Sequence, residues 1–131
     1  MGLDNGITIK NVTRAQLPRF NYPFDTDFTE GEVEVCYWRK WWSFRNRIVN
    51  RLCESMDDER YEYRLSISDV RYMRQLLVNY LHHPASFESE NNYWTFDDVK
   101  YWIRKDIRNL QLLARWMRHH PDKEVFFSDS Y

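Results

Sequence analysis

Polar and apolar residues alternate in short stretches of the chain, and elsewhere apolar residues recur with the spacing of a helix. Strands are predicted over residues 7–10, 32–37, 61–67 and 124–127, and helices over residues 38–52, 69–83 and 99–117. This order lacks the regular strand–helix alternation of a parallel sheet. We therefore predict an α+β fold, with a small antiparallel or mixed sheet of about four strands and with the helices mainly on one face.

Two stretches of the chain show neither kind of periodicity. Residues 14–31 combine prolines with aromatic rings and are predicted to form a long loop, which in a compact domain is often functional. Residues 85–94 are predicted to form a polar loop. Because 131 residues fit one folded unit, we assign residues 1–131 to a single domain.

Capping residues and prolines predict the ends of the second and third helices. Ser68 is expected to cap the second helix, and Thr95 with Asp98 forms a loose capping box before the third. Pro84 and Pro121 are expected to end these helices, since proline disfavours a helical conformation in the residue before it and cannot continue the helix.

Charge and cysteine content narrow the class of protein. The chain has 19 Lys and Arg against 20 Asp and Glu, which argues against both a nucleic-acid coat protein and an acidic DNA mimic. Cys36 and Cys53 lack C-x-x-C spacing and no secretory signal precedes them, so we expect reduced thiols and a cytoplasmic protein. No apolar run approaches the ~20 residues of a membrane helix, and no membrane contact is expected.

Known catalytic and metal-binding motifs are absent from the sequence. It contains no serine elbow, P-loop, dinucleotide fingerprint or H-E-x-x-H motif. The pairs His82-His83 and His119-His120 precede prolines at predicted helix ends, and adjacent helical side chains point about 100° apart, which suits a shared metal poorly. We therefore predict no metal and no cofactor, and binding in preference to catalysis.

Basic and aromatic side chains are concentrated in residues 37–53, which contain no acidic residue. Guanidinium groups beside ring planes are what phosphate and stacked-base recognition require. The same composition also describes an amphipathic helix that buries its rings and leaves its cations in solvent. Both interpretations stay open at the level of sequence.

Arg45 is the least ordinary residue of this segment. At 100° per residue it lies in the middle of the predicted apolar face, between Trp41, Trp42 and Val49. A guanidinium keeps its proton, so its burial requires a carboxylate, a stacking ring or a ligand anion. Arg45 is thus either part of an internal ion pair or ring stack, or a residue that faces a ligand.

Three short motifs occur in this order along the chain: MGLD at residues 1–4, YWRK at residues 37–40 and FFSDSY at residues 126–131. Together they resemble a family of small bacteriophage and prophage proteins without assigned activity. These proteins open with M-G-L-D-M-Y-L, carry Y-W-R-K at a helix start and end in an F-Y-Y-Q-S-S-W-like tail. This chain departs from them at residues 5–7, and it has Arg45 where they usually have a histidine.

The resemblance implies an accessory protein of a mobile element, with a host-takeover or anti-defence role in the cytoplasm of the host cell. Its motifs and the basic segment together give the candidate site residues Asp4, Tyr37, Trp38, Arg39, Lys40 and Arg45. Our leading hypothesis is a non-enzymatic protein that binds a host or defence protein, or sequesters its signalling ligand. The alternatives are nucleotide or nucleic-acid binding through residues 37–53, and a small enzyme that uses Asp4 with Arg39 or Arg45.

Overall fold

A computed structural model describes residues 3–23, 31–53, 61–83 and 96–131, the last range with side chains from residue 99 onward. The strands are β1 (Asp4–Val12), β2 (Gly31–Arg39), β3 (Glu62–Arg64) and β4 (Glu124–Ser130). The α-helices are α1 (Trp42–Leu52), α2 (Ile67–His82) and α4 (Phe96–His119), and a short 3-10 helix, η1, covers Arg14–Gln16.

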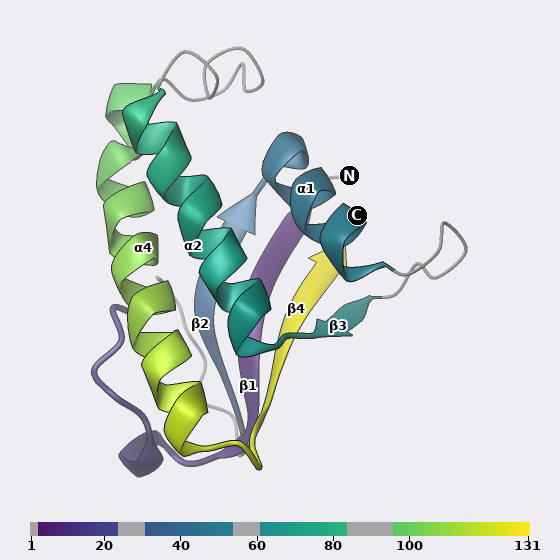
Figure 1. Ribbon diagram of the computed structural model, residues 1–131, viewed down its shortest axis with the longest axis vertical. Helices are drawn as coiled ribbons and strands as arrows, with labels where there is room; N and C mark the ends of the chain where they lie inside the picture. The colour runs from purple at the N-terminus through teal and green to yellow at the C-terminus, as the bar shows by residue number, and fades with distance from the viewer. Residues whose placement is uncertain (1–2, 24–30, 54–60, 84–95) are drawn as a thin grey trace.

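The four strands form one antiparallel sheet in the order β2-β1-β4-β3. The three α-helices lie across one face of this sheet, with α2 packed between α4 and α1 (Figure 1). This arrangement confirms the predicted α+β fold and shows that every strand pairing is antiparallel. The opposite face of the sheet is open in the described part of the chain (Figure 1).

The core lies between the sheet and the helices. The strands contribute the residues that the alternation predicted, among them Ile7 and Ile9 from β1 and Phe127 from β4, all fully buried. The helices contribute apolar residues at helical spacing: Phe44, Ile48, Val70, Met73, Leu77, Ile103, Leu110 and Leu113. Removal of these side chains from water is the main source of stability for the two layers.

The helix predicted over residues 38–52 begins later than expected. β2 continues to Arg39, and α1 begins only after a turn at Lys40, where φ is 56°. Tyr37 and Trp38 pair with β1, and one is exposed while the other is buried, as on a strand. The aromatic residues from Tyr37 to Trp42 fit the spacing of a strand as well as that of a helix. Hydrogen bonding to β1 stabilises the strand at Tyr37 and Trp38. The prediction that YWRK starts a helix was therefore wrong.

The cap of α2 also lies two residues before the predicted one. Ser66 Oγ accepts a hydrogen bond from the Asp69 N–H at 3.1 Å, and the Asp69 carboxylate accepts one from the Ser66 N–H at 2.8 Å. This reciprocal pair satisfies two N–H groups at once. Ser68 could not form such a pair, because the residue three positions after it is Arg71 and not an acid. At the same end of the helix layer, α4 stops two residues before Pro121, as predicted.

The described part of the predicted 14–31 loop, residues 14–23, is fixed to α4. The Asn109 side chain accepts a hydrogen bond from the Asn21 N–H at 2.9 Å and donates one to the Asn21 carbonyl at 2.8 Å. Trp116 Nε1 donates to the Gln16 carbonyl at 3.0 Å. These bonds satisfy the polar groups of a segment that has no partner strand.

Other predictions fall on residues that the structure does not describe. These are residues 24–30 of the aromatic loop, the polar loop over 85–94, Pro84, Thr95 and the side chain of Asp98.

Candidate functional site

The structure divides the six predicted site residues between the two faces of the sheet. Asp4, Tyr37 and Arg39 lie on the open face, near the same end of β1 and β2. The other three lie in the turn after β2 or under the helices: Lys40, Trp38 and Arg45. A strand turns successive side chains to opposite faces, so the YWRK motif cannot present all its side chains to one ligand.

Asp4 and Tyr37 are in direct contact on the open face. The Tyr37 hydroxyl donates a hydrogen bond to Asp4 Oδ1 at 2.6 Å. This bond, together with partial burial, raises the pKa of Tyr37 to about 12. The phenol therefore stays protonated at neutral pH and holds the carboxylate of Asp4 in place.

Arg45 forms an ion pair inside the protein. Its Nη2 lies 2.7 Å from Asp129 Oδ2, and its Nε lies 3.1 Å from each carboxylate oxygen. The Asp129 side chain is only 1% exposed and the Arg45 side chain 12%. Asn5 donates a further hydrogen bond to Asp129 Oδ1 at 2.8 Å. The hydrogen bond to Asp129 raises the pKa of Arg45 further. Of the two hypotheses for Arg45, the geometry supports the internal pair.

Two aromatic rings adjoin this ion pair at the surface. The Tyr131 ring centroid lies 5.0 Å from Arg45 Cζ, and the Trp42 ring packs edge-on against Tyr131 at 5.9 Å. Trp42 is 48% exposed and Tyr131 is 51% exposed, so Trp42 does not belong to the core as its helical position predicted. We call Trp42, Arg45 and Tyr131 the ring patch.

Trp38 faces the core and contacts a buried acid. Its Nε1 donates to Asp106 Oδ2 at 3.0 Å. Asp106 as a whole is partly exposed to solvent, but its carboxyl group is buried. Loss of hydration raises the pKa of Asp106 to about 7, although the Trp38 hydrogen bond and the nearby Lys105 lower it. This carboxyl supports the packing of α4 on β2 and is remote from the ring patch.

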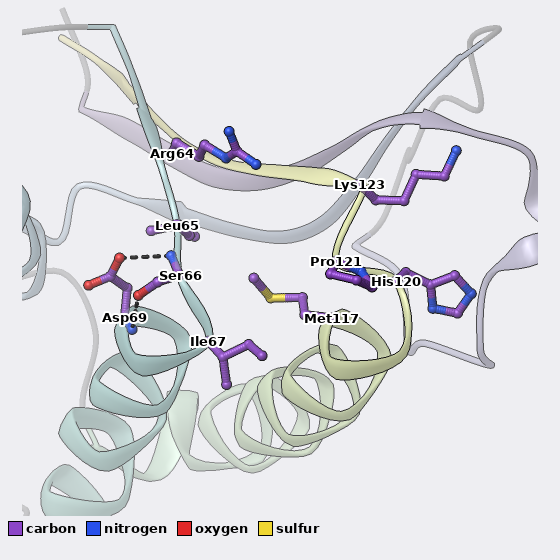
Figure 2. Close-up of a pocket in the computed structure, with 9 residues that line it drawn as sticks. All are labelled: Arg64, Leu65, Ser66, Ile67, Asp69, Met117, His120, Pro121 and Lys123. Carbon is purple, nitrogen blue, oxygen red and sulfur yellow. Dashed lines mark hydrogen bonds between the residues drawn. The ribbon is translucent and has the colours of Figure 1, made fainter.

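A pocket of about 440 Å³ lies at the end of the helix layer where α2 begins and α4 ends (Figure 2). Ile67, Leu65 and Met117 supply apolar surface, and Arg64 and Lys123 stand at its margin (Figure 2). The capping box of α2 occupies its polar groups, as the dashed bonds in Figure 2 show. Lys123 Nζ donates to the Asn11 carbonyl, so one of the two cations at the margin is already engaged within the protein.

A second hollow, of about 370 Å³, lies between α2 and α4 and is lined by arginines. Arg71 and Arg74 come from α2, and Arg115 and Arg118 come from α4. Sequence reasoning missed this site because it concentrated on residues 37–53. A signal was present, since arginines recur on one side of α4.

Cys36 and Cys53 are not joined in a disulfide. Within the ranges that the structure describes, no group of three or more His, Cys, Asp or Glu side chains is placed to hold a metal ion. Among the same residues, the helices are too short or too polar to cross a bilayer.

The comparisons with known proteins returned nothing for this chain: no protein family, no curated protein and no solved structure matches it.

Proposed function

We propose that this chain is a non-enzymatic binding protein that recognises a protein partner through the ring patch. The partner class is a host or defence protein, which is what the resemblance to phage proteins implies. On this proposal the protein acts in the cytoplasm of the host cell. An accessory protein of this kind needs a shaped surface with a few strong anchors.

One observation carries the proposal: two large rings stand half-exposed above a buried ion pair. Trp, Tyr and Arg are the residues that most often dominate the energy of protein interfaces. The Arg45–Asp129 pair fixes the guanidinium beneath the Tyr131 ring, and the Trp42 ring packs against Tyr131. Rings that are already ordered lose less conformational entropy on binding, so more of their contact energy appears as affinity.

The contacts of the open face favour binding over catalysis. Tyr37 donates to Asp4, and its pKa of about 12 lies far from the neutral range in which general acid–base groups work best. Of the two arginines that an enzyme hypothesis pairs with Asp4, Arg45 is held by Asp129 on the other side of the sheet, whereas Arg39 lies opposite Asp4 on β2. Because Asp4 and Arg45 lie on opposite sides of the sheet, they cannot contact the same substrate.

Nucleotide or nucleic-acid binding through residues 37–53 draws less support. Two arginines of this segment are paired within the protein, Arg45 with Asp129 and Arg51 with Asp69. Ion pairs of this kind reduce the charge that a phosphate would meet.

The proposal is tested with the single variants Trp42→Ala and Tyr131→Ala. Tyr101→Ala is the matched control, because Tyr101 is an exposed ring of α4, at the opposite edge of the helix layer (Figure 1). Each tagged protein is incubated with bacterial lysate, and bound proteins are quantified by mass spectrometry. The candidate partner is then purified and its affinity for all four proteins is measured by calorimetry.

Loss of an interface anchor costs at least 2 kcal/mol in typical cases, so Trp42→Ala should weaken binding by about 30-fold or more. Tyr101→Ala should leave affinity within about twofold of the parent protein. Equal affinity for the parent protein and both ring-patch variants would refute the proposal. Circular dichroism confirms that each variant is folded before binding is measured.

A further inference from the structure

The outer side of the helix layer carries a line of arginines. Arg71 and Arg74 of α2 face Arg115 and Arg118 of α4 across the hollow between the two helices. The floor of the hollow is the buried Ala114. A small residue at this position lets the helices approach closely and leaves room above it for a ligand.

α4 extends this line beyond the hollow with Arg104 and Arg108, which are exposed. Counted from Arg104, positions 108, 115 and 118 fall within about 40° of one line along the helix. At 1.5 Å per residue, the line from Arg104 to Arg118 is about 21 Å long. We call this set the arginine face: Arg71, Arg74, Arg104, Arg108, Arg115 and Arg118.

Nothing in the described part of the chain neutralises the arginine face. The ion pairs there involve Lys10, Arg45 and Arg51, and none of the six arginines takes part. The acidic groups of α2 and α4 with described side chains are engaged elsewhere, Asp69 with Arg51 and Asp106 with Trp38. Among the described residues, the six arginines therefore have no acidic partner, although the net charge of the chain is only −1.

Arg74 gives an independent sign that the hollow is suited to an anion. Its Nε atom is buried and has no hydrogen-bond partner in the described structure. A buried donor without an acceptor destabilises the folded protein, because the bond it made to water is not replaced. An anion in the hollow would offer acceptors to this guanidinium once the side chain turns toward it, which would offset part of that cost.

We propose that the arginine face binds the phosphate backbone of a nucleic acid. Each strand of a nucleic acid carries one charge per 3.4 Å along its axis, so a line of about 21 Å spans about six phosphates. A ligand confined to the hollow would not reach Arg104, which does not line it. All six cations are arginines, whose planar donors match phosphate oxygens in pairs.

This binding depends on charge and is largely independent of base sequence. The arginine face and the ring patch lie on different elements, so the two activities are separable by mutation. The Arg104, Arg108, Arg115 and Arg118 side chains project from one continuous helix, which keeps their spacing fixed.

The test measures fluorescence anisotropy of a labelled 12-nucleotide oligo-dT at 50, 100 and 200 mM salt. A duplex of the same length and polyglutamate as competitor form two further arms. The variants are Arg115→Gln and Arg115→Gln/Arg118→Gln. The matched control is Arg47→Gln, because Arg47 is an exposed arginine of α1 and the change in charge is the same.

If four phosphates are contacted, binding of the single strand should weaken about 50-fold between 50 and 200 mM salt. With one contact fewer, as in Arg115→Gln, the loss over the same range should be about 20-fold. At 50 mM salt this variant should bind about tenfold more weakly than the parent protein, because it lacks one charged hydrogen bond. Arg47→Gln should stay within about twofold of the parent protein.

Three results would overturn the proposal. The first is no binding of either nucleic acid at 50 mM salt with about 100 μM protein, the weak end of non-specific affinity. The second is an equal loss in Arg47→Gln and Arg115→Gln. The third is displacement of the oligonucleotide by polyglutamate at an equal concentration of charges, which would assign the face to an acidic protein. Tighter binding of the duplex than of the single strand would support the proposal and identify the form of nucleic acid.

Discussion

Replacement of Asp106 by Asn should remove most of one pH-dependent contribution to stability. The Asp106 carboxyl accepts the Trp38 hydrogen bond between α4 and β2, and loss of hydration raises its pKa to about 7. An Asn side chain has nearly the same shape and keeps an oxygen that can accept this bond. It lacks the negative charge that the parent protein has to bury above neutral pH.

The sign follows from proton binding in the two states. In the unfolded chain an aspartate has a pKa of about 3.9. The folded protein holds the proton of Asp106 more tightly, so this group favours the folded state at low pH, and the advantage is lost as pH rises from about 4 to about 7. Between pH 5 and pH 8 the parent protein should lose about 2.5 kcal/mol from this group alone.

The free energy of unfolding is measured by urea denaturation of the parent protein and Asp106→Asn at pH 5, 6, 7 and 8. The difference between the two proteins should shift by about 2.5 kcal/mol in favour of the variant across this range, since all other groups titrate in both. Asp122→Asn is the control, because Asp122 is exposed in the turn before β4. A difference that stays constant with pH for Asp106→Asn would refute the assignment of a raised pKa to this carboxyl.

Two further predictions concern buried groups. Arg45→Ala should destabilise the protein by about 3–5 kcal/mol, because it leaves the Asp129 carboxylate buried without its cation. Arg51→Ala breaks a more exposed ion pair and should lower the free energy of unfolding by about 1 kcal/mol or less, as measured by chemical denaturation. Burial raises the pKa of the Cys36 thiol well above its ordinary value, so iodoacetamide should modify Cys53 first under native conditions. Equal losses for the two arginines, or equal labelling rates for the two thiols by mass spectrometry, would contradict these expectations.

The order of strands and helices could be predicted from sequence because the spacing of apolar residues, every second residue in a strand and every third or fourth in a helix, shows which side of the element is buried. Residues 7–10 and 69–83 show this clearly, since their apolar positions become core positions in β1 and α2. The method failed at Trp38, where neighbouring rings fit a strand and a helix equally well. The choice there depends on pairing with β1, more than 30 residues earlier in the chain.

The candidate site was harder to predict because it depends on contacts between distant residues. Helical spacing placed Arg45 on the inner side of α1, but its partner Asp129 is 84 positions away and lies on β4. The arginine face is a property of two packed helices. The arginines of α2 alone, Arg71 and Arg74, give no reason to expect a cationic groove until α4 places Arg115 opposite them.

The position of β4 in the sheet has a consequence for protein synthesis. β4 lies between β1 and β3, and its pairing partner β1 is made more than 100 residues earlier. Until the ribosome has passed residue 130, β1 lacks its neighbour on one side and β3 has no partner strand, so the sheet cannot close before β4 has been made. Contacts of such large sequence separation slow folding, and the nascent chain should expose unpaired strand edges to chaperones until β4 emerges.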